Sequence, residues 1–256
     1  MSKFPINIYH CCVFKTGSQW IRGILQHPLI KAASELDCYR YEDHLPGNTD
    51  SRKITERFFD SFLPKQKILS PLFLSFNCFQ SIPKPAHYRA FFITRDPRDI
   101  TVSLYYSILY SHREMGHIAE MRNNLKKKSQ SDGLFQVIDW GVELGIFEAL
   151  LSWASAQDID PCVKIFRFED LTCKEKFHHF TQLMNHCQIG ISRTELKQIL
   201  KDLSFENLSG RSKGSEDINS HYRKGISGDW KNHFNGETEA YFFNRTNSLL
   251  KDTGYL

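Results

Sequence analysis

The chain has 256 residues, of which 41% are hydrophobic and 24% are charged, and its formal net charge is +4. This length suits a substantial core, so we expect one domain over residues 1–256. The mild charge gives no support for a nucleic-acid-binding protein. No stretch approaches the ~18 uncharged apolar residues that a membrane-spanning helix needs, so no membrane segment is expected.

The N-terminus and the cysteines indicate a cytoplasmic protein. Residues 1–6 lack the long apolar core of a secretory signal peptide. Seven cysteines are scattered along the chain without a Cys-x-x-Cys pair. We therefore expect reduced thiols packed as small apolar groups, and no metal site.

Predicted strands and helices alternate along the chain. Apolar runs rich in β-branched and aromatic residues predict strands at 6–14, 66–69, 88–94 and 162–168. Apolar spacing predicts helices at 20–26, 51–63, 97–110, 134–156, 174–186 and 194–202. Polar segments at 114–133 and 209–228 are expected to be mobile loops or lids. The alternation predicts an α/β fold with a central parallel sheet flanked by helices.

A polar turn joins the first predicted strand to its helix. Its residues are Lys15, Thr16, Gly17, Ser18, Gln19 and Trp20. Backbone N–H groups and the positive helix end converge at such a turn, where Gly17 permits close approach and Lys15 adds a charge. The side chains at 16, 18 and 19 can donate to phosphate oxygens. A phosphate is the expected ligand, and the alternative is an ordinary polar turn with a capped helix.

This turn resembles the 5′-phosphosulfate loop of the cytosolic sulfotransferase family, which reads Lys-Ser-Gly-Thr-Thr-Trp. The resemblance implies that Lys15 contacts the bridging oxygen and the sulfuryl group of 3′-phosphoadenosine 5′-phosphosulfate (PAPS). It also implies that residues 16–19 hold the 5′-phosphate and that Trp20 stacks on adenine; the alternative for Trp20 is a core aromatic. The nucleotide-triphosphatase signature does not fit, because Lys15 precedes the glycine.

Residues 95–106 resemble the family's 3′-phosphate segment. Arg95 and Ser103 occupy the positions of the strand-end arginine and of the serine eight residues later that meet the phosphate. A strand-end guanidinium supplies paired donors, and a serine two helical turns later can face the same site. Arg98 is expected to pair with Asp96 or Asp99 on the surface.

A third string, from residue 222 to residue 234, closely resembles the family's Arg-Lys-Gly-x-x-Gly-Asp-Trp-Lys-Asn. The resemblance implies that Arg223, Lys224 and Gly225 grip the 3′-phosphate from a flexible lid. Without the family, two cations beside a glycine in a polar loop still suit an anion.

Two weaker matches concern the adenine. Residues 166–171 resemble the family's Tyr-Glu-Asp-Leu segment with Phe168 in place of the tyrosine, and residues 203–208 resemble Thr-Ser-Phe-x-x-Met with Phe205 as the aromatic. The resemblance places both rings near adenine; as an isolated feature Phe205 would be core. Because the matches follow the family order, they imply a P-loop-like sulfotransferase fold that encloses PAPS, or its product PAP, in one cage.

The general base is where the chain departs from the family. Residues 68–74 stand where the cytosolic family has His-Leu-Pro, and they contain no histidine. Glycan sulfotransferases of the wider superfamily use an acidic residue soon after the first helix, where this chain has Glu35, Glu42, Asp43 and His44. His44 is the first choice because its ordinary pKa lies near working pH. The alternative for His44 is a plain surface histidine.

Together these features predict a sulfotransferase that moves a sulfuryl group from PAPS to a hydroxyl or amine of a small-molecule acceptor. Positioning and positive charge would supply most of the catalysis. The missing histidine keeps open a non-catalytic relative that binds PAP or PAPS. The strand-loop-helix start keeps open a P-loop kinase. The sequence predicts neither the acceptor nor the oligomeric state.

Overall fold

A computed structural model describes residues 7–114 and 117–256. The N-terminal segment considered as a signal, with Ile6 of the first predicted strand, and positions 115–116 of the first predicted loop lie outside the described residues. The chain forms two compact units: the first comprises residues up to 95 and residues 148–203, and the second comprises residues 96–147 and 204–256. The single domain over 1–256 stays a prediction.

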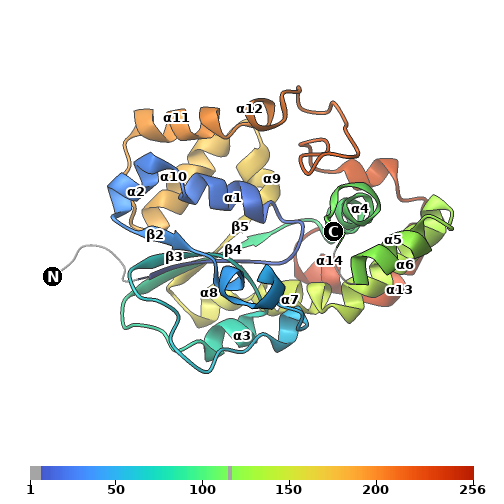
Figure 1. The fold of residues 1–256 in the computed structure, drawn as a ribbon, viewed down its shortest axis with the longest axis horizontal. Helices are drawn as coiled ribbons and strands as arrows, with labels where there is room; N and C mark the ends of the chain where they lie inside the picture. Colours follow the sequence, from blue (N-terminus) through green and yellow to red (C-terminus); the bar gives the residue numbers. More distant parts are fainter. Residues whose placement is uncertain (1–6, 115–116) are drawn as a thin grey trace. The chain divides into compact units, whose positions relative to one another are not determined.

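The first unit contains a five-stranded parallel sheet in the order β2-β3-β1-β4-β5 (Figure 1). The strands are β1 (Asn7–Cys12), β2 (Asp37–Tyr39), β3 (Lys67–Phe73), β4 (Tyr88–Thr94) and β5 (Val163–Arg167). Every residue of β1 is buried, because this strand lies between β3 and β4 under helices on both faces. The segments that follow β1 and β4 therefore emerge at the same edge of the sheet.

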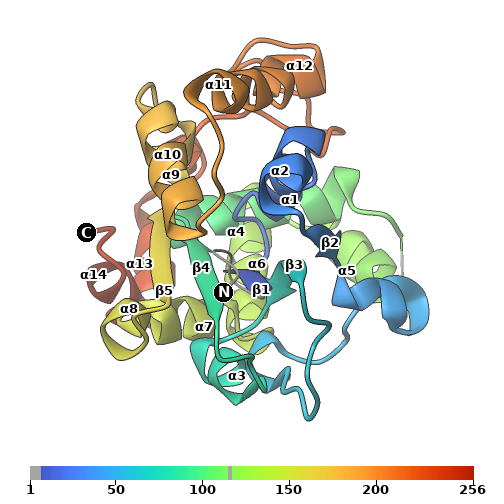
Figure 2. The same ribbon diagram turned by 90° about the vertical axis from the view of Figure 1, so that its left-hand side faces the viewer.

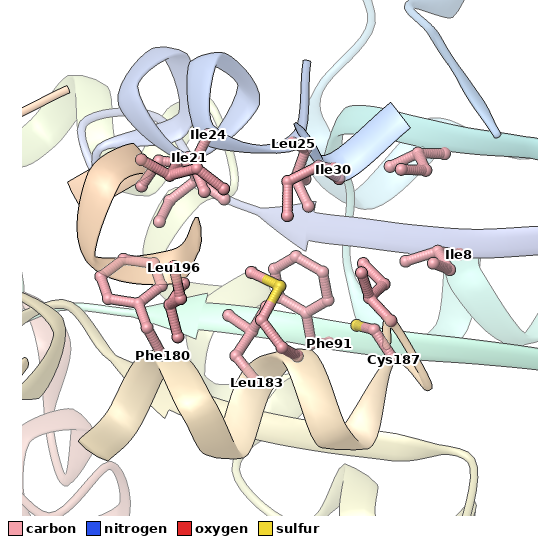
Figure 3. Close-up of a cluster of buried hydrophobic side chains, with 14 of the residues drawn as sticks. Ile8, Ile21, Ile24, Leu25, Ile30, Phe91, Phe180, Leu183, Cys187 and Leu196 are labelled. Carbon is pink, nitrogen blue, oxygen red and sulfur yellow. The ribbon is translucent and has the colours of Figure 1, made fainter. Parts of the chain in front are cut away.

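Helices cover both faces of this sheet (Figure 2). One face carries α1 (Ser18–Leu25), α2 (Pro28–Ser34) and α10 (Lys176–His186), with α9 (Phe168–Thr172) and α11 (Arg193–Asp202) nearby; the other carries α3 (Phe76–Ser81), most of α7 (Ile146–Trp153) and α8 (Ala156–Ile159). Figure 3 shows Ile21 and Leu25 of α1 facing Leu183 of α10 across the buried cluster. On the opposite face, Trp153 stacks on Phe92 with ring centroids 4.6 Å apart.

The second unit is helical. It contains α4 (Pro97–Tyr106), the π-helical turn η4 (Ser107–Ser111), α5 (His117–Leu125), α6 (Gln130–Glu143), α12 (Phe205–Ser209), α13 (Gly236–Thr246) and α14 (Leu249–Asp252). Helix α6 packs against both α4 and α13 (Figure 1). Residues 210–228 form turns without a helix, and the 3₁₀ turn η5 (Asp229–Asn232) follows them. The loop predicted at 209–228 is thus confirmed from residue 210 onward.

Most predicted elements are present with shifted ends. The strand predicted at 66–69 extends to Phe73, whereas the three-residue β2 was too short to be recognised. The helix predicted at 97–110 passes into η4 after residue 106. The helix predicted at 134–156 is interrupted at Gly145, whose φ of +73° ends α6 before α7 begins.

Two predictions about segments are wrong. The segment 51–63 contains only the 3₁₀ turn η3 (Ile54–Glu56), because the Arg57 side chain donates to the carbonyls of Asp50 and Arg52 and replaces helical donors there. The segment 114–133 was expected to be a loop, but its described part contains α5 and the start of α6. Arg122 anchors α5 by donating to the carbonyl of Ile108 at 2.7 Å.

The remaining expectations concern membranes and thiols. Among the described residues, no helix combines the length and apolarity that crossing a bilayer requires. All seven cysteines are free thiols, four of them buried, as the sequence predicted.

Candidate functional site

The turn between β1 and α1 in the first unit is held by its own backbone. Lys15 and Gly17 both have positive φ angles, of 67° and 80°, which fold the chain back into α1. Thr16 is fully buried, and its hydroxyl donates to the carbonyl of Val13 at 2.9 Å. The Thr16 hydroxyl therefore closes the turn, so that its backbone N–H is the donor left for an anion. No acidic residue lies in the first turn of α1 to oppose an anion there.

Arg95 and Phe168 lie against this turn. The Arg95 guanidinium follows β4, is buried, and donates through Nη1 to the carbonyl of Lys15 at 2.8 Å. It also lies over the Phe168 ring, 4.6 Å from its centroid. A Cβ atom at Gly17 would lie 2.7 Å from the same ring, so only glycine fits there. The structure thus brings together residues that the sequence assigned to three separate motifs.

Trp20 is anchored in the core of the first unit. Its Nε1 donates to the carbonyl of Leu203 at 2.8 Å. Its ring meets Phe168 and Phe180 edge-on, at centroid distances of 6.2 and 5.5 Å. The prediction of a core aromatic therefore holds for the part of the Trp20 indole that makes these contacts. The residue as a whole is only partly buried. Of the other expected loop residues, Ser18 is buried and Gln19 is partly buried.

The candidate bases differ in exposure and partners. Glu42 is buried and accepts from Arg40 at 2.5 Å, with a guanidinium nitrogen of Arg57 3.7 Å away. Asp43 is exposed and pairs with Arg40 at 2.7 Å. His44 is exposed at the end of the 3₁₀ turn η1 (Tyr41–His44), and its ring stacks on Tyr39 at 4.8 Å. Glu35, also exposed, caps the C-terminus of α2.

Arg57 is a buried cation that sequence reasoning missed. Its guanidinium donates to the carbonyls of Asp50 and Phe73, at 2.7 and 3.3 Å, and to the hydroxyl of Tyr41 at 3.2 Å. It also lies 5.4 Å from the ring centroid of Phe14, the residue before Lys15. Arg57 thus ties the segment that contains the base candidates to the end of β3. No sequence signal could have found it, because most of its acceptors are backbone carbonyls.

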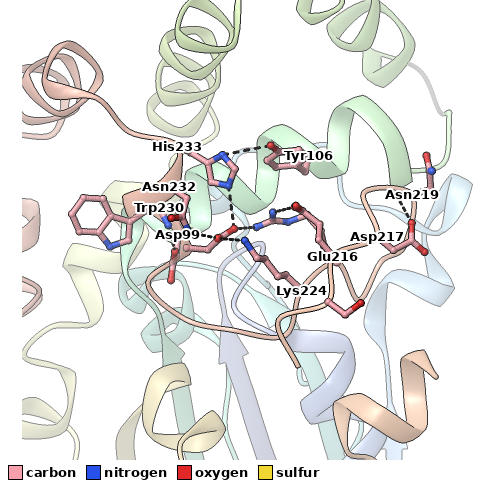
Figure 4. A network of polar contacts seen from close by, with 12 residues as sticks. Asp99, Tyr106, Glu216, Asp217, Asn219, Lys224, Trp230, Asn232 and His233 are labelled. Carbon is pink, nitrogen blue, oxygen red and sulfur yellow. Dashed lines mark hydrogen bonds and ion pairs between the residues drawn. The ribbon is translucent and has the colours of Figure 1, made fainter. Parts of the chain in front are cut away.

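In the second unit, Arg223 and Lys224 converge on one carboxylate; Figure 4 shows Lys224 in this network. Asp229 accepts from Arg223 Nη2 at 2.5 Å and from Lys224 Nζ at 2.6 Å, and also from Asn232 and His233. Burial alone would raise the pKa of the Asp229 carboxyl, but these hydrogen bonds together hold its pKa well below the usual range. The pair is therefore fixed in position by a buried anion.

Asp99 links helix α4 to the same segment. It is buried, and its carboxylate accepts from the backbone N–H groups of Gly228 at 2.7 Å and Trp230 at 2.9 Å. Arg98 pairs with Asp96 at 2.8 Å, as expected, but it is buried over the Trp230 ring, 3.7 Å from the centroid. The expected surface position of Arg98 is wrong, because the indole covers it.

Gly225 and Phe205 also meet in the second unit. Gly225 has a φ of +68°, and a Cβ atom there would lie 2.4 Å from the Phe205 ring. Ser103 lies on α4 and is partly buried. Each unit thus pairs one motif glycine with one of the two phenylalanines that the resemblance places near adenine.

Comparison with known proteins decides the family. The sulfotransferase domain family matches residues 10–254 of the chain. The chain belongs to this family. Among curated relatives, this sulfotransferase is 24% identical to human sulfotransferase 1C2 over 266 positions, which cover 90% of this chain and 78% of the relative. It is 28% identical to mouse sulfotransferase 2A6 over 166 positions, covering 60% of this chain and 53% of the relative.

Solved structures confirm the predicted fold. Mouse sulfotransferase SULT7A1 complexed with PAP superposes with a TM-score of 0.58 at 15% identity, covering 100% of this chain and 90% of the other. Retinol dehydratase in complex with androsterone and inactive cofactor PAP superposes with a TM-score of 0.61 at 16% identity, covering 98% and 82%. The α/β class, with its parallel sheet flanked by helices, is therefore that of the sulfotransferases.

Proposed function

We propose that the chain transfers a sulfuryl group from PAPS to a hydroxyl or amine of a small-molecule acceptor. The observation that carries the proposal is the hydrogen bond from Arg95 to the Lys15 carbonyl, which joins the expected 3′-phosphate arginine to the expected 5′-phosphosulfate turn. Two solved relatives are PAP complexes, and one of them also holds androsterone, a small molecule. A cytosolic location is proposed on the resemblance to the cytosolic family alone.

The residues present fit a doubly phosphorylated nucleotide. In the first unit, a positive charge at Lys15 and a helix start without acidic residues suit the 5′-phosphosulfate. In the second unit, two cations that already hold a carboxylate suit a phosphate. Phe168 and Phe205 would pack against adenine.

Each group has a chemical role in the proposal. PAPS, when bound, supplies the activated sulfuryl group, and PAP is released as the product. Lys15 and the N–H groups of residues 16–19 would neutralise charge that develops on the leaving phosphate. Arg95, Ser103, Arg223, Lys224 and Gly225 would hold the 3′-phosphate, and Trp20 would contact adenine with its exposed part.

We propose His44 as the general base. Two of its rivals, Glu42 and Asp43, already pair with Arg40, and Glu42 is buried as well. His44 is exposed, so an acceptor can reach its imidazole. The His44→Gln variant should lower kcat about 100-fold or more. His87→Gln, at another exposed histidine, is the matched control; equal rates for both variants would exclude His44.

The decisive experiment follows labelled sulfate from PAPS to a panel of phenols, alcohols, amines and sugars. Labelled product that requires PAPS supports the proposal. Tight PAP binding without turnover on any acceptor would favour a non-catalytic relative, and phosphoryl transfer from ATP would favour a kinase. Arg95→Ala and Lys224→Ala should each lose PAP affinity; unchanged affinity in both would contradict the proposed site.

A further inference from the structure

A second carboxylate in the second unit, that of Glu216, accepts from the Arg223 guanidinium; Figure 4 shows Glu216 in this network. Arg223 donates through Nη1 to Glu216 and through Nη2 to Asp229. Its guanidinium also lies over the Tyr106 ring, 4.5 Å from the centroid. Burial raises the pKa of the Tyr106 hydroxyl, and the charges of Glu216, Arg223 and Asp229 also act on it. Both ends of the guanidinium are therefore occupied by carboxylates.

Backbone hydrogen bonds hold Glu216 at this place. The N–H of Gly214 donates to the carbonyl of Lys224, and the N–H of Asp217 donates to the carbonyl of Arg223, both at 2.9 Å. The Arg211 side chain donates to the carbonyls of Tyr222 and Arg223, at 2.6 and 3.0 Å. Residues 214–217 thus run beside residues 223–224. These backbone contacts place the Glu216 side chain next to the Arg223 guanidinium.

The two carboxylates are held very differently. The Asp229 side chain is 2% exposed and accepts from four side chains, so it is a permanent part of the segment. The Glu216 side chain is 34% exposed, and within the described residues its ion-pair partner is Arg223. A ligand that competes for Arg223 would displace Glu216 first, because that ion pair is partly solvated and its loss leaves no buried charge.

We infer that Glu216 sets the affinity for the 3′-phosphate by occupying Arg223 until the nucleotide displaces it. This inference rests on the proposed function, in which Arg223 and Lys224 take that phosphate. A phosphate carries close to two negative charges near neutral pH, so it replaces the single charge of Glu216 with a stronger partner. Breaking the ion pair reduces the affinity that the two cations would otherwise give.

The substitution Glu216→Gln removes this competition and keeps the side-chain length. PAP should bind about three- to five-fold more tightly, the equivalent of one partly exposed ion pair. Adenosine 5′-monophosphate, which lacks the 3′-phosphate, should bind the variant and the parent chain equally. The contrast between the two nucleotides locates the effect at the 3′-phosphate.

Asp217→Asn is the matched control. It removes the same charge one residue further on, where the Asp217 carboxylate accepts from the backbone N–H of Asn219 at 3.0 Å. Titration calorimetry of the full chain and both variants, with PAP and with the monophosphate, supplies the measurement. A gain for PAP in Glu216→Gln that Asp217→Asn lacks supports the inference.

The other outcomes separate the two proposals. If both variants change PAP affinity equally, general electrostatics explains the change and the role of Glu216 is overturned, while the proposed function stands. A gain of Glu216→Gln for both nucleotides would overturn it too. If the parent chain and both variants bind no PAP at millimolar concentration, the proposed function fails, and the role of Glu216 fails with it.

Discussion

The turn at residues 13–20 and the segment at residues 211–234 each contain a string that resembles the same family, at 15–20 and 222–234, yet different forces hold them in place. Backbone carbonyls of the turn accept from Thr16 and Arg95, without any carboxylate partner in those bonds. The segment depends on Asp99 and Asp229, two buried carboxylates. The turn should therefore keep its shape across a wide pH range, whereas the segment depends on ionised carboxylates.

Asp229→Asn should have the largest effect. A neutral amide cannot compensate the positive charges of Arg223 and Lys224. We therefore expect a loss of about 3 kcal/mol in the unfolding free energy of the second unit. Because the native pKa of Asp229 is lowered, its contribution is present above the ordinary Asp pKa of about 3.9 and is lost as the pH falls below it. The variant should lack this acid-dependent loss.

Amide hydrogen exchange resolves the two regions and gives the measurement. Protection of residues 223–233 should drop in Asp229→Asn, and protection of residues 13–20 should not. Asp217→Asn, a more exposed carboxylate of the same segment, is the control and should change neither region. Equal loss of protection in both regions would show that the turn also depends on the Asp229 carboxylate.

Gly225→Ala should rank second. The added Cβ would lie 2.7 Å from Cγ of Phe205, the ring atom nearest the Phe205 backbone. A rotation of the ring alone therefore cannot relieve the overlap. We expect about 2 kcal/mol of destabilisation beyond the strain of the positive φ, together with weaker PAP binding. Gly210→Ala has a similar φ of +70° and meets nothing within 4 Å, so it isolates the strain. Equal unfolding free energies for the two variants would show that the collision is relieved.

The acid response of the first unit should come mainly from His10 on β1, with a smaller part from His186 on α10, whose pKa burial also lowers. Complete burial lowers the pKa of His10 to about 3. Between about pH 6.5 and pH 3 the unfolded chain binds a proton that the native state does not. The unfolding free energy therefore decreases by about 1.4 kcal/mol for each unit by which the pH is lowered. His10→Leu should remove most of this slope in urea titrations at pH 6.5 and 5.5, whereas His44→Leu, at an exposed site, should retain it. A slope unchanged in His10→Leu would assign the acid response elsewhere.

How much the sequence predicts follows from the range of each interaction. Strands such as β4 are buried on both faces, so their sequences are apolar runs that can be recognised without the structure. Arg223 and Lys224 belong to a short string that can be recognised as it stands. The sequence could not predict that Asp99 fixes the segment around Gly228 and Trp230. Its carboxylate accepts from backbone N–H groups that lie about 130 residues later in the chain.

Segments organised by one side chain are a second kind of miss. Arg57 donates to the carbonyls of Asp50, Arg52 and Phe73, and these bonds prevent the helix that the apolar spacing of 51–63 predicts. Glu216 contacts Arg223 through a polar turn that carries no periodic pattern. In both cases the information lies in backbone geometry that residue types do not encode.

Thr16 gives the smallest and most selective test of the turn. Its hydroxyl was expected to donate to a phosphate, but in the structure it donates to the Val13 carbonyl. Thr16→Val should therefore cost about 1 kcal/mol of unfolding free energy, while Thr16→Ser, which keeps the hydroxyl, should be nearly neutral. If Thr16→Val instead retained full stability in urea and lost PAP affinity, the hydroxyl would serve the ligand. The turn would then be rearranged by nucleotide binding rather than formed in advance, and its contrast with residues 211–234 would disappear.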